Sequence, residues 1–252
     1  MFTELRLIVK NNNGKTYIDD CYFTSPLKIG TPNYEKDRLL AVIMMASAGV
    51  LKGDCFDYYI ECAQNAKMVL TEQSYTKLFD MGEGSAVKRV RINVGEKASL
   101  YYKQCAVIPF KNSCFESSTT ISLSEKSEFA ICDIIAAGRV GMGEAFLYKH
   151  YRSRIEVQLE GRSVWLDQCV LEPKRNKLQN LVYFGKYTHQ GLFYYFGDKQ
   201  KQMSLIKYEP DADNIEYAVT EAYRGIVVRV LACSAQEIEE VFGEIVELIK
   251  IG

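Results

Sequence analysis

The segments IECAQNAKMVLT (residues 60–71), INVGEKASLYYK (92–103) and ISLSEKSEFAIC (121–132) align with one another without gaps. Each contains a strand-like run, a short polar turn and a second strand-like run. A unit of this size cannot bury its own apolar face, so its repetition favours stacking of successive units around a continuous core. The repeat therefore predicts a mainly β fold with strands stacked as in a β-helix or solenoid. The alternative is three β-hairpins that resemble one another by chance.

Stacking would place equivalent positions of the units in columns, with neighbours about 5 Å apart as in adjacent strands. Alternation puts Met68 and Leu70 on one apolar face, and the residues that continue that face in the three units are Glu72, Gln104 and Asp133. Charge at the edge of an interior is costly unless it is paired, protonated or bound to a cation. The columns therefore indicate a conduit or a binding groove more than a reaction centre.

Other parts of the chain add strands and few helices. Runs rich in β-branched and aromatic residues, such as KTYIDDCYF, RIEVQLE and GIVVRVLA, predict further strands. Ser234 and Glu237 have the spacing of a capping box, and apolar residues then fall on one face, which predicts an amphipathic C-terminal helix over about 235–250. A weaker helical candidate covers 199–208. We expect a single domain spanning residues 1–252.

The C-terminal helix also suggests an interaction surface. Val241, Phe242, Ile245 and Ile249 make its face more apolar than a solvated end of the chain requires. We therefore expect these four residues to bind a partner protein. Packing of the same face into the core is the alternative.

Composition excludes several classes of partner. The chain has 31 basic and 32 acidic residues, so no net field favours nucleic acid or an anionic membrane. Its longest apolar run, LLAVIMMASAGVL at 39–51, is too short to span a bilayer. The N-terminus, MFTELRLIVK, lacks the apolar region of a secretory leader, so we expect a cytoplasmic protein with reduced thiols. The eight cysteines include no C-x-x-C pair and there are two histidines, which argues against a fixed metal cage.

The stretch AAGRVGMGEAF at 136–146 resembles a phosphate-binding loop but lacks its chemistry. Gly138, Gly141 and Gly143 do not have P-loop spacing, and Glu144 would repel phosphates. We expect the glycines to allow a sharp turn and close packing between layers. Arg139 and Glu144 are then candidates for an internal ion pair at that corner. A sharper hypothesis makes Glu144 a carboxylate that passes a metal ion.

Ordered motifs from about residue 26 to the 180s resemble the UreD/UreH family of urease accessory proteins. The resemblance implies a β-helical protein without enzymatic activity that acts as a chaperone or scaffold in nickel insertion into urease. It implies three partners, namely the urease apoprotein, UreF, and the GTPase UreG through UreF. It also implies no tightly bound cofactor, with nickel in transit through an internal tunnel. The motifs are Ser25-Pro26-Leu27-Lys28, Gly53-Asp54, residues 70–77, Ile108-Pro109-Phe110, residues 138–146, and Asp167 with Leu171.

Under this resemblance, Asp54, Glu72, Asp133 and Glu144 are candidates for a transient nickel path, because oxygen ligands bind Ni²⁺ weakly enough to release it. The sequence Glu72-Gln73-Ser74 departs from the Thr-Pro-Gly common in the family. Some of these carboxylates are alternatively ordinary turn residues, as Gly53-Asp54 would be. Two other classes stay open: a cytoplasmic β-helical interaction scaffold, and a carbohydrate-active β-helix protein that uses Glu72 and Asp133 as its carboxylate pair.

Overall fold

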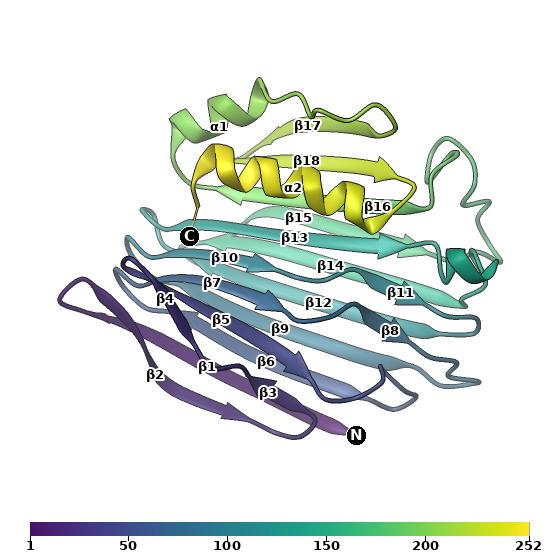
Figure 1. Cartoon of the computed structure of the whole chain (residues 1–252), viewed down its shortest axis with the longest axis horizontal. Coiled ribbons are helices and arrows are strands. Elements are labelled where there is room, and N and C mark those ends of the chain that lie inside the picture. The colour runs from purple at the N-terminus through teal and green to yellow at the C-terminus, as the bar shows by residue number, and fades with distance from the viewer. Residues whose placement is uncertain (252) are drawn as a thin grey trace.

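The structure, a computed structural model, describes residues 1–251. Two β-sheets lie face to face and form a β-solenoid of about four turns, with both helices on the outer face of one sheet (Figure 1). The first sheet has seven strands in the order β15 (Arg162–Leu171), β14 (His150–Leu159), β12 (Cys114–Leu123), β9 (Ala86–Val94), β6 (Cys55–Cys62), β1 (Phe2–Asn12) and β2 (Lys15–Phe23).

The second sheet has eleven strands. Its main path runs through β17 (Glu216–Ala222), β18 (Gly225–Ala232), β16 (His189–Phe196), β13 (Glu128–Ala136), β10 (Ser99–Lys103), β7 (Lys67–Glu72), β5 (Arg38–Met45) and β3 (Leu27–Ile29). Three short strands pair beside this path: β4 (Asn33–Glu35), β8 (Thr76–Leu78) and β11 (Val107–Pro109).

The predicted repeat is confirmed as a stack of layers. In the second sheet, Leu100 of β10 aligns with Met68 of β7 on one side and with Phe129 of β13 on the other, in parallel register. The first strands of the units, β6, β9 and β12, stack in parallel in the first sheet. Because the two strands of each unit belong to different sheets, the units are turns of a solenoid and not hairpins.

Equivalent tight turns join the two sheets at one end of the solenoid. The amides of Ala66, Ala98 and Ser127 each donate to the carbonyl three residues earlier, at 3.0 Å in every case. Asn65 and Lys97, at matching positions, both have positive φ, at 61° and 58°. The polar turns of the sequence repeat therefore form equivalent tight connections between the two sheets. Longer loops join the sheets at the opposite end, on the right in Figure 1.

Helix α2 (Ala235–Ile249) covers the outer face of the second sheet and makes a second core there. Its capping box between Ser234 and Glu237 forms as predicted. The helix lies so close to β16 that a Cβ at Gly191 would overlap Ile238 and lie 2.9 Å from Phe242. No helix within residues 1–251 is long and apolar enough to cross a membrane.

The packing of α2 contradicts the partner-binding role that we expected for its apolar face. Val241, Phe242, Ile245 and Ile249 are at most 2% exposed and belong to the second core. The amphipathic pattern correctly indicated a buried face, and the second sheet of the same chain buries it. Core packing, the alternative considered above, is the arrangement observed.

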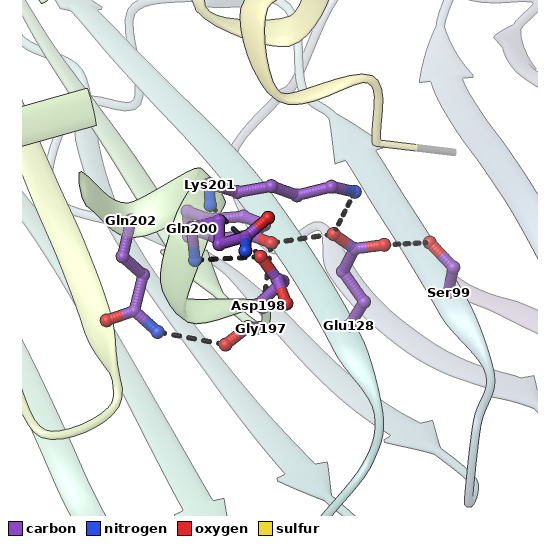
Figure 2. Close-up of polar contacts among 8 residues, drawn as sticks. Ser99, Glu128, Gly197, Asp198, Gln200, Lys201 and Gln202 are labelled. Carbon is purple, nitrogen blue, oxygen red and sulfur yellow. Dashed lines mark hydrogen bonds and ion pairs between the residues drawn. The ribbon is translucent and has the colours of Figure 1, made fainter. Parts of the chain in front are cut away.

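Helix α1 (Lys199–Ile206) lies within the weaker helical candidate and is fastened to the second sheet by polar contacts (Figure 2). The Asp198 side chain accepts hydrogen bonds from the first-turn amides of the helix. Glu128 of β13 accepts from Lys201 Nζ at 2.6 Å and from the Tyr195 hydroxyl at 2.6 Å. These contacts lie at the tight-turn end of β13, away from the carboxylates that the sequence singled out.

Candidate functional site

A row of polar side chains crosses the interior between the two sheets near the loop end of the solenoid. We call it the polar row. It bridges the sheets three times, through Glu72 with Lys88, Asp133 with Ser153, and Asp167 with Arg229.

Strand register places these residues level with one another except Asp167, which pairs with Ile155, two residues along β14 from Ser153. In the second sheet, Glu72 and Asp133 each follow residues that align through β10, and Asp133 pairs in register with Leu192, which pairs with Arg229. In the first sheet, Lys88 aligns with Ser117 and Ser117 with Ser153. The alternation predicted from sequence thus brings Glu72 and Asp133 to one level, two strands apart. Gln104 follows the last residue of β10.

Glu72 is the most fully bonded carboxylate of the row. Its Oε1 atom accepts from Lys88 Nζ at 2.7 Å and from the Tyr102 hydroxyl at 2.9 Å, and its Oε2 atom accepts from the Cys105 amide at 3.3 Å. The side chains of Lys88 and Glu72 are only 14% and 10% exposed. The Lys88 ammonium also lies 5.1 Å from the centre of the Tyr58 ring. The charge of Glu72 is therefore balanced inside the protein.

Asp133 has a weaker set of partners. Its Oδ2 atom accepts from the Ser153 hydroxyl at 2.9 Å. Burial raises the pKa of Asp133 above its usual value, the carboxylates of Asp167 and Glu72 raise it further, and the Ser153 hydrogen bond and Lys88 act in the opposite direction. A carboxyl group in this position has more to gain from a proton or a cation than a fully paired one.

The polar row borders two cavities. The larger, of about 400 Å³, is lined by Glu72 and Lys88 together with apolar side chains such as Val50 and Phe115. The smaller, of about 20 Å³, is lined by residues that include Asp133, Asp167 and Arg229. Burial and the neighbouring Asp133 raise the pKa of Cys169, beside this cavity, to about 12, so its sulfur is a neutral thiol at neutral pH.

Asp54 has a structural environment. Its side chain is 8% exposed and accepts from the Leu51 amide at 2.8 Å and from the N-terminal amine of Met1 at 3.2 Å. Gly53 before it has φ +79°. This is the turn arrangement that the sequence left open as an alternative, and Asp54 lies outside the linings of both cavities described above.

The glycine-rich loop forms a rigid corner after β13, around the 3₁₀ turn η1 (Val140–Met142). A Cβ at Gly138, where φ is +142°, would lie 2.5 Å from the Glu144 carbonyl oxygen, and Gly143 ends the turn at φ +74°. Gly141 has open space around it. Two of the three glycines are therefore required by the turn.

Arg139 and Glu144 form the expected pair, through two hydrogen bonds. The pair is not internal as predicted, because the two side chains are 37% and 24% exposed. The guanidinium stacks over Phe110, with its carbon 4.4 Å from the ring centre. Glu144 is fully engaged by Arg139, which holds the pKa of its carboxyl below the usual value.

Sequence reasoning missed Lys88, Ser153 and Arg229, and it gave Asp167 no role. A signal for two of them exists. Lys88 shares the alternation of Val90 and Ile92 on the buried face of β9, and Asp167 shares that of the partly buried Trp165 in β15. A charge on an apolar face indicates an internal partner.

The metal-binding side chain types of the described residues are dispersed. Within residues 1–251, no group of three or more His, Cys, Asp or Glu side chains is arranged to hold a metal ion. The carboxylates of the polar row belong to three separate bridges between the sheets. Such donors bind nickel loosely compared with a cluster of imidazoles and thiolates.

Comparison with known proteins gives one consistent family. The family model described as UreD urease accessory protein matches residues 2–251. The chain is 34% identical to the urease accessory protein UreH of Helicobacter hepaticus over 219 residues, which is 87% of this chain and 86% of the relative. It is 33% identical to the urease accessory protein UreD of Acetivibrio thermocellus over 248 residues, 95% and 94% of the two chains. It is 35% identical to UreH of Helicobacter acinonychis over 189 residues, 74% and 72% of the two chains.

Proposed function

The chain belongs to the UreD family of urease accessory proteins, and on that premise we propose that it serves nickel insertion into urease as a scaffold that also conducts the metal. In this proposal it links the urease apoprotein to UreF, and through UreF to the GTPase UreG, in the cytoplasm. Nickel is cargo in transit between the two sheets. The chain itself catalyses no reaction.

The polar row is the observation that carries the proposal. Between sheets whose inward residues are otherwise mostly apolar and buried, it supplies carboxylates at Glu72 and Asp133 on one level of the solenoid and a third at Asp167, two residues further along the strands. Buried charge of this kind costs free energy and adds little stability even when it is paired. Its presence is explained if the interior must accept a cation.

The same geometry argues against the carbohydrate-active alternative. A glycosidase needs its two carboxylates on either side of one bound sugar. Glu72 lines the larger cavity and Asp133 the smaller, and about 20 Å³ holds little more than a water molecule. The pair that the sequence suggested therefore does not share a site for a sugar ring.

A different surface replaces the face of α2 as the proposed partner contact. Leu181, Val182 and Met142 are 93%, 83% and 74% exposed, in two loops at the loop end of the solenoid. These loops touch, because the Phe146 and Phe184 rings meet edge to face at 5.1 Å. Exposed apolar side chains on a corner held by an ion pair are preorganised for a protein partner.

Co-expression with UreF and the urease subunits tests both the scaffold role and the proposed contact surface. We expect the wild-type chain to co-elute with them in size-exclusion chromatography, and Met142→Asp with Leu181→Asp to weaken one contact. Leu248→Asp is the matched control, because Leu248 of α2 is 45% exposed. A folded chain that elutes alone in every combination would contradict the scaffold role, and equal binding by all variants would move the contact elsewhere.

A further inference from the structure

Lys88 is a feature of the polar row that a cation path does not need and would be expected to avoid. We propose that its ammonium group is a tethered cation that closes the passage at Glu72, and that divalent cargo enters by displacing it. This inference rests on the proposed nickel transit and adds a regulatory residue to it.

The hydrogen bonds of Glu72 show what cargo must displace. Oε1 is occupied by Lys88 at 2.7 Å and Tyr102 at 2.9 Å, and Oε2 faces the Cys105 amide at 3.3 Å. Because Oε1 accepts two hydrogen bonds, a metal ion can bind this oxygen only where one of them is released. The Lys88 bond is the one that can be released by rotating a flexible side chain, since the Cys105 donor is backbone and the Tyr102 ring is fully buried.

Charge works in the same direction. The Glu72 carboxylate and the Lys88 ammonium sum to zero, so the closed pair offers a divalent ion no net attraction, and the ammonium repels it at short range. Once Lys88 leaves, the position carries one negative charge in a largely buried setting. Removal of the ammonium should therefore strengthen cation binding at Glu72.

The larger cavity gives cargo a route to the pair. Both residues line it, and its volume of about 400 Å³ is many times the roughly 10–15 Å³ that one water molecule needs. An ion can thus arrive with its water shell and exchange waters for Glu72 where Lys88 stands. The ion pair lies at the point where the hydrated ion leaves the cavity and enters the interior.

Titration of the purified full-length chain with NiCl₂ tests the inference. We expect Lys88→Met, which keeps the side-chain length and removes the charge, to bind one nickel ion at least tenfold more tightly than wild type. The gain should vanish in Lys88→Met/Glu72→Gln. Lys77→Met is the matched control, because Lys77 lines the same cavity without an ion pair to Glu72, and its nickel affinity should stay within twofold of wild type.

Equal nickel affinity for Lys88→Met and wild type would overturn the inference, and so would an equal gain in Lys77→Met. If Lys88→Met does not fold, Lys88→Gln takes its place, and wild-type crystals soaked in NiCl₂ give a second test. Nickel bound to Glu72 must appear with Lys88 rotated away from the carboxylate. An unchanged affinity in Lys88→Met, combined with loss of urease activation in Glu72→Gln, would reject the closure by Lys88 and leave nickel transit standing.

Discussion

Replacing Asp133 by asparagine is expected to stabilise the fold at neutral pH, which is unusual for a residue placed in a functional row. Burial and neighbouring carboxylates raise the pKa of this group, so the folded protein holds its charged form less favourably than the unfolded chain does. Asparagine removes the charge and keeps an oxygen that accepts from Ser153. The gain should be about 1 kcal/mol, at the low end of the ~1–3 kcal/mol for a poorly paired buried polar group.

The pH dependence follows from the direction of the shift. A raised folded pKa means that the native state binds the Asp133 proton more tightly than the unfolded state does. Stability from this group is therefore complete below its unfolded pKa of about 3.9 and is lost as pH rises through the folded value. The advantage of Asp133→Asn should be largest at pH 7 and should disappear as the pH approaches 4.

Urea unfolding between pH 4 and pH 8 measures both effects. In a thermal melt, the same gain of 1 kcal/mol should raise Tm by roughly 2–4 °C for a chain of this size. Asp167→Asn is the matched control, because Asp167 is paired with Arg229 and its loss should destabilise slightly, by about 0.2–1 kcal/mol. If Asp133→Asn destabilises the fold as Asp167→Asn does, Asp133 is a structural group and the reasoning is refuted.

Three further outcomes follow from the packing and the donor set. Phe242→Ala should cost about 3–5 kcal/mol in urea unfolding, whereas Leu248→Ala on the exposed side of α2 should cost under ~0.5 kcal/mol; equal effects would contradict the core role of α2. Glu144→Ala should lower the stability only slightly because its pair with Arg139 is partly exposed, and a melting temperature as low as that of Phe242→Ala would contradict this. X-ray absorption of the nickel-loaded wild-type chain should show oxygen ligands, and a tight sulfur-ligated ion would contradict the weak path.

The repeat could be read from sequence because the information that specifies it is local. Each unit carries its own alternation and its own polar turn, so aligning three units sufficed to predict that Met68, Leu100 and Phe129 share a column, as they do. The continuation of that face to Glu72 and Asp133 required only the period of two. The capping box at Ser234 is local in the same way.

Contacts across the interior could not be read in this way. Lys88 meets Glu72 because β9 faces β7 from the other sheet, and no spacing in the sequence encodes which strands face each other. The face of α2 was misassigned for a related reason, since amphipathicity indicates that a face is covered and not what covers it. The Arg139–Glu144 pair was correctly matched but wrongly buried, because the position of a loop relative to solvent depends on the whole fold.

The nickel content of urease activated by preassembled complexes tests nickel transit most directly. Complexes containing the Glu72→Gln/Asp133→Asn chain should form with the same stoichiometry as wild-type complexes in size-exclusion chromatography. With nickel limiting, they should deliver markedly less metal to urease, measured by elemental analysis of the separated enzyme. Equal nickel delivery from intact variant complexes would contradict passage through the polar row.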